Sequence, residues 1–198
     1  VDIGAGTGQL TVGFAARDCR VIGVEPDDRM RQVLASREGI ADTFAGSAEA
    51  LPLPDSSADL IAGAQMWHWV DPSRAVPEIA RVLRPGGVLA IVWSLRDDNE
   101  PWLKAMEQVV ELPDSYKWFR KNDIPVLAKP FGAMDLQEFA FTQTSTPEGL
   151  VGLVGTFSHV ALSDRRDKIE ADVRELTQTH PDLAGKDTFE VPYVCKVF

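Results

Sequence analysis

The chain has 198 residues, of which 44% are hydrophobic and 25% are charged, a balance typical of a folded globular protein. A formal net charge of −10 and a pI of about 4.7 exclude a generally basic surface, so we expect no nucleic-acid partner. No apolar run approaches the roughly 20 residues of a membrane span. Cys19 and Cys195 stand in no metal-binding or redox spacing, so we interpret both as core residues of a protein in a reducing, cytoplasmic compartment.

The first half of the chain alternates short strands with helices. Strands are predicted at residues 1–3, 19–24, 40–45, 58–64 and 88–93. Helices are predicted at residues 9–17, 27–38 and 72–83, and a turn at 84–87. This alternation is the signature of a parallel sheet covered by helices on both faces.

The second half departs from this pattern. Helices are predicted at 101–112, 147–154 and 163–179, and strands at 137–144 and 188–198. Because the last strand alternates apolar and polar residues and contains Pro192, we expect an antiparallel edge strand or a bulge there. The segment 112–134, which is rich in proline and aromatic residues, is interpreted as a substrate-covering insertion or as a plain connecting loop.

Together these patterns predict an α/β fold, a Rossmann-like three-layer sandwich with a mostly parallel sheet and an antiparallel edge strand. We expect one domain over residues 1–198. Because Val1 lies inside the first predicted strand, we also expect that an N-terminal segment is missing.

The first predicted strand ends in a glycine-rich turn formed by Gly4, Ala5, Gly6, Thr7 and Gly8. Glycine has no Cβ, so a ligand can approach the backbone, and the following helix N-terminus favours an anionic or polar group. A dinucleotide and S-adenosylmethionine both fit this arrangement. The dinucleotide fingerprint GxGxxG has its third glycine where this chain has Gln9, which disfavours NAD. Glu25, which closes the second strand, can accept hydrogen bonds from both ribose hydroxyls of either cofactor.

Four stretches at their present spacing resemble the class I S-adenosylmethionine-dependent methyltransferases of the ubiquinone/menaquinone-biosynthesis ("type 11") family. They are VDIGAGTG, GVEP, GSAEALPLPDSSADLI and RVLRPGG. Two others, AQMWHWVD and VLAIVWS, resemble more closely the trans-aconitate methyltransferase-like branch. The resemblance implies methyl transfer from S-adenosylmethionine, leaving S-adenosylhomocysteine, to a small-molecule acceptor that is a carboxylate, a hydroxyl or a quinol-like compound. It implies no metal.

The resemblance also implies a set of cofactor contacts. Asp2 would hold the methionine end, and Glu25 would bind the ribose. The backbone of the turn, at Gly4, Gly6 and Gly8, would approach the cofactor closely. Contacts with adenine or with the sulfur end are implied for Pro26, Met30, Ser47, Ala48, Glu49 and Gln65. Ser47 stands where the family usually has aspartate. This difference implies either weaker cofactor binding or that Glu49 takes over the contact that the aspartate would make.

Candidate acceptor-binding residues follow the fourth and fifth predicted strands, where ligands bind in open α/β sheets. They are Trp67, Trp69, Trp93 and Trp102, which predict an apolar acceptor pocket, although each could instead pack in the core. His68, the candidate catalytic residue, is interpreted in three ways, as a base, as a clamp for the acceptor, or as a structural residue that caps the next helix. His159 and His180 are expected on the surface.

Two other functions remain compatible with these patterns. One is an NAD(P)-dependent oxidoreductase, which Gln9 disfavours. The other is a non-catalytic domain that keeps the fold and the cofactor.

Overall fold

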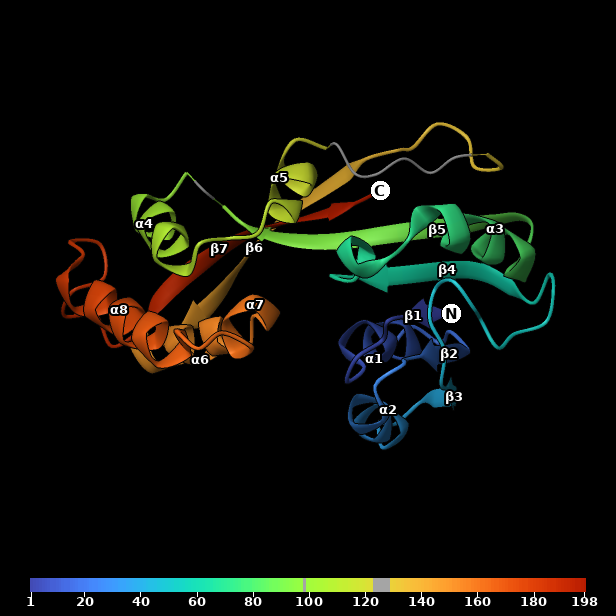
Figure 1. Ribbon diagram of the computed structural model, residues 1–198, viewed down its shortest axis with the longest axis horizontal. Coiled ribbons are helices and arrows are strands. Elements are labelled where there is room, and N and C mark those ends of the chain that lie inside the picture. Colours follow the sequence, from blue (N-terminus) through green and yellow to red (C-terminus); the bar gives the residue numbers. More distant parts are fainter. Residues whose placement is uncertain (98, 123–128) are drawn as a thin grey trace. The chain divides into compact units, whose positions relative to one another are not determined.

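The computed structural model describes residues 1–97, 99–122 and 129–198 (Figure 1). Its strands are β1 (Asp2–Ile3), β2 (Val21–Val24), β3 (Ile40–Phe44), β4 (Ala58–Ala64), β5 (Leu83–Arg96), β6 (Gln137–Ser145) and β7 (Phe189–Val197). The helices of the first half are α1 (Gln9–Ala15), α2 (Asp28–Ala35), the 3₁₀ helix η1 (Trp67–Trp69) and α3 (Pro72–Val82). Those of the second half are α4 (Pro101–Val110), α5 (Ser115–Arg120), α6 (Pro147–Gly155), α7 (Ser158–Ala161) and α8 (Arg166–Thr179).

The strands form one seven-stranded sheet in the order β3-β2-β1-β4-β5-β7-β6. β1 pairs in parallel with β2 and β4, and the pairs β2–β3 and β4–β5 are also parallel. Ile91 and Phe198 exchange both backbone hydrogen bonds at 2.9 Å, the pattern of an antiparallel pair, so the end of the chain runs against β5. The predicted Rossmann-like class, with a mostly parallel sheet and an antiparallel strand, is confirmed. The expectation that residues 188–198 form the edge strand is wrong, because β7 lies between β5 and β6, and β6 forms the edge.

The described chain divides into two compact units. The first consists of Val1–Trp93, the described part of Ile124–Gln137, and Lys196–Phe198. Here α1 and α2 lie beside β2 and β3 (Figure 1). Five aliphatic side chains with no solvent exposure form the centre of its core, namely Ile3, Val24, Leu34, Ile61 and Ile79.

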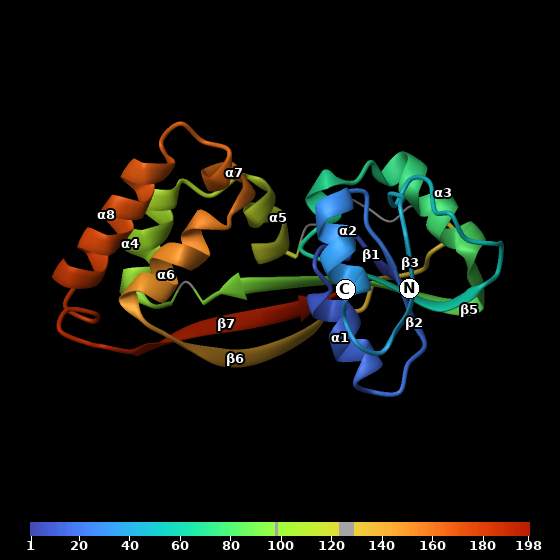
Figure 2. The ribbon, with the colours of Figure 1, turned by 90° about the horizontal axis from the view of Figure 1, so that it is seen from below.

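The second unit consists of the described part of Ser94–Asp123, and Glu138–Cys195. Its helix α8 packs against both α4 and α6 (Figure 2). They enclose a separate apolar cluster that includes Leu103, Met106, Leu150, Val154 and Val173. β5 and β7 contribute residues to both units.

Helix starts follow local sequence signals. The side chain of Asp27 accepts hydrogen bonds from two backbone N–H groups at the start of α2, and Asp71 accepts one from Ser73 at the start of α3. Proline occupies the first position of α3, where a backbone N–H would have no partner within the helix. Pro77 is tolerated inside the same helix. The predicted helix over residues 72–83 is therefore confirmed to within one residue.

Several expectations are wrong in detail. The turn predicted at 84–87 lies inside β5 as a bulge, because the register passes from Ala58 opposite Leu83 to Leu60 opposite Val88. Cys19 is exposed and not in the core, since β2 begins only at Val21. α5 and α7 lie where no helix was predicted. Of the segment 112–134, residues 123–128 lie outside the described residues, and its substrate-covering role stays a prediction.

Candidate functional site

The glycine-rich turn between β1 and α1 has a left-handed backbone at three positions. The φ angles of Gly4, Gly6 and Gly8 are 60°, 57° and 91°. A side chain is strained in this region, so the turn requires glycine for its backbone as well as for ligand access. A Cβ on Gly4 would lie 3.0 Å from the side chain of Met66, and one on Gly8 would lie 2.8 Å from Leu34 Cδ1. A Cβ on Gly6 would meet no protein atom within 4 Å.

Glu25 connects this turn to the end of β2. Its Oε2 accepts a hydrogen bond from the backbone N–H of Gly6 at 2.8 Å, and its Oε1 accepts one from Asp27 at 2.9 Å. The residue is 5% exposed. A carboxylate has about four acceptor positions, so both oxygens can still accept hydrogen bonds from the hydroxyls of a ligand.

A cavity of about 410 Å³ opens at the carboxyl ends of β1, β2 and β4. Its walls include many of the residues singled out in the sequence, namely Gly4, Gly6, Glu25, Pro26, Met30, Ser47, Ala48, Glu49, Gln65 and Trp69. Ala64, Met66 and Val70 complete the lining and were not singled out. Ala64 ends β4 and the other two follow it, so the order of the strands brings all three to the edge of the sheet where ligands bind in this architecture.

Three of the residues expected to bind the cofactor lie outside this lining. Ala5 is buried behind the turn, and its N–H donates to the carbonyl of Val24 at 3.2 Å. Gly8 precedes α1 as its N-terminal cap residue. Asp2 is 1% exposed, and its Oδ2 accepts a 2.6 Å hydrogen bond from the hydroxyl of Thr11.

Glu49 is fixed at the edge of the cavity by the start of α3. Its Oε1 accepts a hydrogen bond from the backbone N–H of Asp71 at 2.9 Å. Burial opposes its ionisation, but the hydrogen bonds from Asp71 and from the Ser47 hydroxyl outweigh burial and lower the pKa of Glu49. Glu49 is therefore a charged acceptor at neutral pH, next to the hydroxyl of Ser47.

The loop that carries these residues is fastened to α3 by Arg81. Its guanidinium donates to the carbonyl oxygens of Leu51 and Leu53 at 3.1 and 2.8 Å, and it pairs with Asp55 at 2.6 Å. Glu78 holds the guanidinium from the other side and also accepts the N–H of Leu51 at 2.8 Å. We call this arrangement the Arg81 clasp.

Gln65 leaves β4 with a left-handed backbone, with a φ of 57°. Its N–H still donates to the carbonyl of Val92 at 3.0 Å, so the strand pairing continues up to the cavity wall. A non-glycine residue in this region is strained, and such strain is concentrated at functional sites. The conformation supports a functional position for Gln65.

The four tryptophans are not gathered around one cavity. Trp69 is 69% exposed and lines the cavity. Trp67 and Trp93 are buried in the first unit, each 1% exposed. Trp102 belongs to the second unit, where it packs edge-on against Phe189 at 5.4 Å between ring centroids. A role for all four in acceptor binding stays a prediction.

His68 lies beside the cavity lining without forming part of it. Its ring is 4.8 Å from that of Trp69 and 5.1 Å from that of Trp93. Burial lowers the pKa of His68, which favours the neutral imidazole at pH 7. The expectation that His68 caps the next helix is wrong, because Asp71 caps α3. His159 and His180, expected on the surface, are both partly buried.

Asp2 makes the stability of the protein depend on pH. Burial raises the pKa of Asp2 to about 6, against the hydrogen bond from Thr11, which lowers it. The folded protein therefore binds this proton more tightly than the unfolded chain, whose carboxyl has a pKa of 3.8. Stability falls as the pH rises from about 4 to about 6, and the penalty is complete above that range.

We expect Asp2→Asn to remove this dependence. The free energy of unfolding of the variant, relative to the original chain, should rise by about 3 kcal/mol between pH 4 and pH 7, since one pKa unit corresponds to about 1.4 kcal/mol. Urea unfolding of both proteins across this range measures the difference. Thr11→Val, which removes the hydrogen bond but keeps the carboxyl, is the control and should retain the dependence. Parallel pH profiles for Asp2→Asn and the original chain would contradict the assignment.

Among the described residues, no group of three or more histidine, cysteine, aspartate or glutamate side chains is placed to hold a metal ion. In the same part of the chain, no helix is long and apolar enough to cross a membrane.

Comparisons with known proteins agree with this geometry. A family model described as a methyltransferase domain matches residues 1–91. An uncharacterized methyltransferase of Mycobacterium tuberculosis (strain ATCC 25618 / H37Rv) is 39% identical over 198 residues, which cover 98% of this chain and 79% of that protein. An uncharacterized methyltransferase-like protein of Schizosaccharomyces pombe is 32% identical over 206 residues, which cover 100% of this chain and 80% of that protein.

A solved structure from Anaeromyxobacter dehalogenans, provisionally named a type II methyltransferase, has a TM-score of 0.73 to this chain. It is 22% identical, and the match covers 99% of this chain and 85% of that one, so it supports the fold alone. The alternative of an NAD(P)-dependent oxidoreductase is wrong, because the matching family and the relatives that match nearly all of this chain are methyltransferases. The chain belongs to the class I S-adenosylmethionine-dependent methyltransferases.

Proposed function

We propose that this chain transfers the methyl group of S-adenosylmethionine to a small-molecule acceptor. The observation that carries the proposal is the cavity at the carboxyl ends of β1, β2 and β4. It combines a glycine turn open to a ligand, a buried carboxylate at the end of the next strand, and apolar walls from Pro26 and Met30. A ligand made of a nucleoside and an amino acid fits these features. The turn would face its amino-acid part, the carboxylate its ribose, and the apolar walls its base.

The residues of the cavity fit that cofactor one by one. Glu25 is proposed to accept hydrogen bonds from the ribose hydroxyls, since its oxygens retain acceptor capacity. Gly6 is proposed to lie against the cofactor, because no protein atom occupies the space where a Cβ would be. The charged Glu49 and the Ser47 hydroxyl are proposed to read the adenine edge, which compensates for the missing family aspartate.

When bound, S-adenosylmethionine supplies an electrophilic methyl group on a sulfonium centre. The task of the protein is to align the acceptor with that carbon, and it needs a base only where the acceptor carries a proton at neutral pH. We propose that His68 accepts this proton, because the lowered pKa of its imidazole favours the neutral form. A carboxylate acceptor needs no base and would instead require a cationic or hydrogen-bonding clamp.

Calorimetric titration tests the cofactor assignment. S-adenosylhomocysteine, the product, should bind with one site per chain, and NADH at the same concentration should give no heat of binding. Formation of S-adenosylhomocysteine from S-adenosylmethionine should then depend on an added acceptor, which a non-catalytic domain would not show. Binding of NADH without binding of S-adenosylhomocysteine would refute the proposal.

The acceptor class is tested by a screen over carboxylic acids, phenols and quinols with isotopically labelled methyl groups. We propose a carboxylate, a hydroxyl or a quinol-like compound as the acceptor. We also propose a cytoplasmic location, because neither cysteine stands in a redox or metal-binding spacing in the sequence.

A further inference from the structure

Arg96, the last residue of β5, is a buried charge whose hydrogen-bonding capacity is not used. Its side chain is 5% exposed. Its Nε and Nη2 atoms are buried, and no residue in the described part of the chain accepts a hydrogen bond from either. The carboxylate of Glu107 is 4.0 Å from Nε, beyond hydrogen-bonding distance. Since a guanidinium stays charged in proteins, such burial is unfavourable unless an anion pairs with it.

Aromatic rings cover Arg96 but leave its donors available. The Cζ atom is 4.7 Å from the centroid of the Phe157 ring and 5.9 Å from that of Tyr116. These contacts engage the guanidinium through its positive charge and stabilise it as cation–π interactions. A ring does not replace an oxygen acceptor for the N–H groups, which point outward in the plane of the guanidinium.

The two unpaired atoms form the edge of the guanidinium that binds a carboxylate with two hydrogen bonds. The same unit contains an example of this geometry. Arg174 binds Glu148 through Nε at 2.8 Å and Nη2 at 3.0 Å, one bond to each carboxylate oxygen. On Arg96 the equivalent pair of atoms has no such partner. The free edge therefore has the shape of a carboxylate receptor.

In the part of the chain that the structure describes, the charged groups near Arg96 offer it one distant carboxylate. Glu107 is already paired closely with Arg120, so one carboxylate faces two guanidinium groups. His159 is not a second cation, because burial first and the charge of Arg96 in addition lower its pKa, while its contact with the Val110 carbonyl raises it. The pKa of Tyr193 is raised by burial, so its phenol is neutral. Among the described residues, Arg96 thus has one carboxylate within 4.0 Å, and that carboxylate is paired more closely with Arg120.

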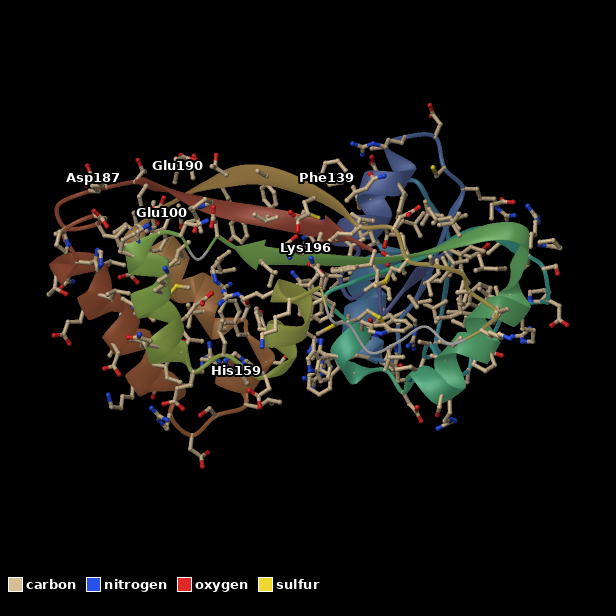
Figure 3. The ribbon with its side chains drawn as sticks, turned by 90° about the horizontal axis from the view of Figure 1, so that it is seen from above. Glu100, Phe139, His159, Asp187, Glu190 and Lys196 are labelled. Carbon is tan, nitrogen blue, oxygen red and sulfur yellow. The ribbon has the colours of Figure 1, made fainter. Side chains whose placement is uncertain are left out.

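A cavity of the second unit is lined by two of the residues that lie next to Arg96. Glu107 and Tyr116 are both in the wall of a cavity of about 360 Å³, which is also lined by the cations Lys104 and Arg120. Tyr116 is only partly buried and belongs to the six-residue helix α5. Figure 3 shows His159 on the helical side of this unit, opposite Phe139 and Glu190 of the strands.

We propose that Arg96 is the centre of a carboxylate-binding site in the second unit, entered from this cavity by displacement of the Tyr116 ring. The ligand class is a small organic carboxylate, held by two hydrogen bonds from Nε and Nη2 and flanked by aromatic rings. The site does not depend on the proposed cofactor. Its ligand is either the methyl acceptor or a carboxylate that is bound without being methylated.

Titration calorimetry on the full chain tests the site. The carboxylates are benzoate, succinate and citrate, and chloride at the same ionic strength is the control anion. At least one of these carboxylates should bind the original chain. Arg96→Met should weaken that binding about 30-fold, and Arg96→Lys, which keeps the charge but lacks the two-donor edge, about tenfold. Arg174→Met, which removes a paired and more exposed arginine of the same unit, should leave carboxylate binding unchanged. S-adenosylhomocysteine should bind all these proteins equally, so failure of the cofactor proposal is measured separately.

Stability separates a binding role from a structural one. Because the unpaired charge is unfavourable, Arg96→Met should unfold at the same or a higher temperature than the original chain without ligand, and it should lose the thermal shift that the carboxylate causes. Mass spectrometry after incubation with S-adenosylmethionine then identifies the source of the ligand. A methyl ester marks the acceptor and an unmodified acid marks a second ligand, and both outcomes support the site. Equal binding by Arg96→Met, no preference for carboxylate over chloride, or loss of folding in both Arg96 variants would overturn it.

Discussion

Replacement of Glu25 by glutamine should weaken the binding of S-adenosylhomocysteine by roughly 100-fold. Glutamine has one acceptor oxygen, so either Gly6 or Asp27 loses its hydrogen bond, and the ribose loses a charged acceptor. Two hydrogen bonds to a charged group contribute about 3 kcal/mol in total, and each 1.4 kcal/mol is a factor of ten in affinity. Titration calorimetry measures the change.

The matched control for this variant is Glu38→Gln, which changes an exposed glutamate of the same unit. It should leave the affinity for S-adenosylhomocysteine unaltered. Because Glu25 also supports the turn, thermal unfolding without ligand should show a lower melting temperature for Glu25→Gln. An unchanged affinity in a folded Glu25→Gln protein would exclude the ribose role.

Alanine at Gly6 and at Gly8 should separate ligand binding from stability. At Gly6 a Cβ meets no protein atom but faces the cavity, so we expect more than tenfold weaker S-adenosylhomocysteine binding and a loss of stability of about 1–2 kcal/mol from the left-handed backbone. At Gly8 the Cβ would lie 2.8 Å from the fully buried Leu34. Strain and overpacking together should then cost roughly 3 kcal/mol of stability.

Urea unfolding without ligand and calorimetry with S-adenosylhomocysteine measure the two effects on each variant. Gly13→Ala provides the control, because this glycine lies within α1 and its Cβ would also meet no atom within 4 Å. It should increase stability by up to 1 kcal/mol through helix propensity. If Gly6→Ala and Gly8→Ala lose affinity and stability in the same proportion, the turn has no position dedicated to the ligand.

The fold, and many of the residues that line the cavity, were predictable because their signals are local. A glycine turn after a strand, an acid at the end of the next strand and alternating strands and helices are each contained in a few consecutive residues. The contribution of Met66 and Val70 to the cavity was not predictable in this way. It depends on the order of the strands, which brings the end of β4 beside β1.

The acceptor side was less predictable, because tryptophan spacing gives no measure of burial. Trp67 and Trp69 both follow β4, and Trp93 lies within β5, yet of these three only Trp69 lines the cavity. The cluster around Arg96 was missed altogether. Its members Tyr116 and Phe157 are separated from Arg96 by 20 and 61 positions in the sequence, and only the packing of the second unit brings them together.

The Arg81 clasp has a consequence for the rate of cofactor exchange. Because folding already fixes the loop 51–55 to α3, the ligand does not have to order that loop on arrival. Binding to a preorganised wall loses less conformational entropy, and the association step is not delayed by closure of this loop. The Arg81 clasp thus fixes the backbone that follows Ser47 and Glu49, the two residues proposed to read the adenine edge, before the cofactor arrives.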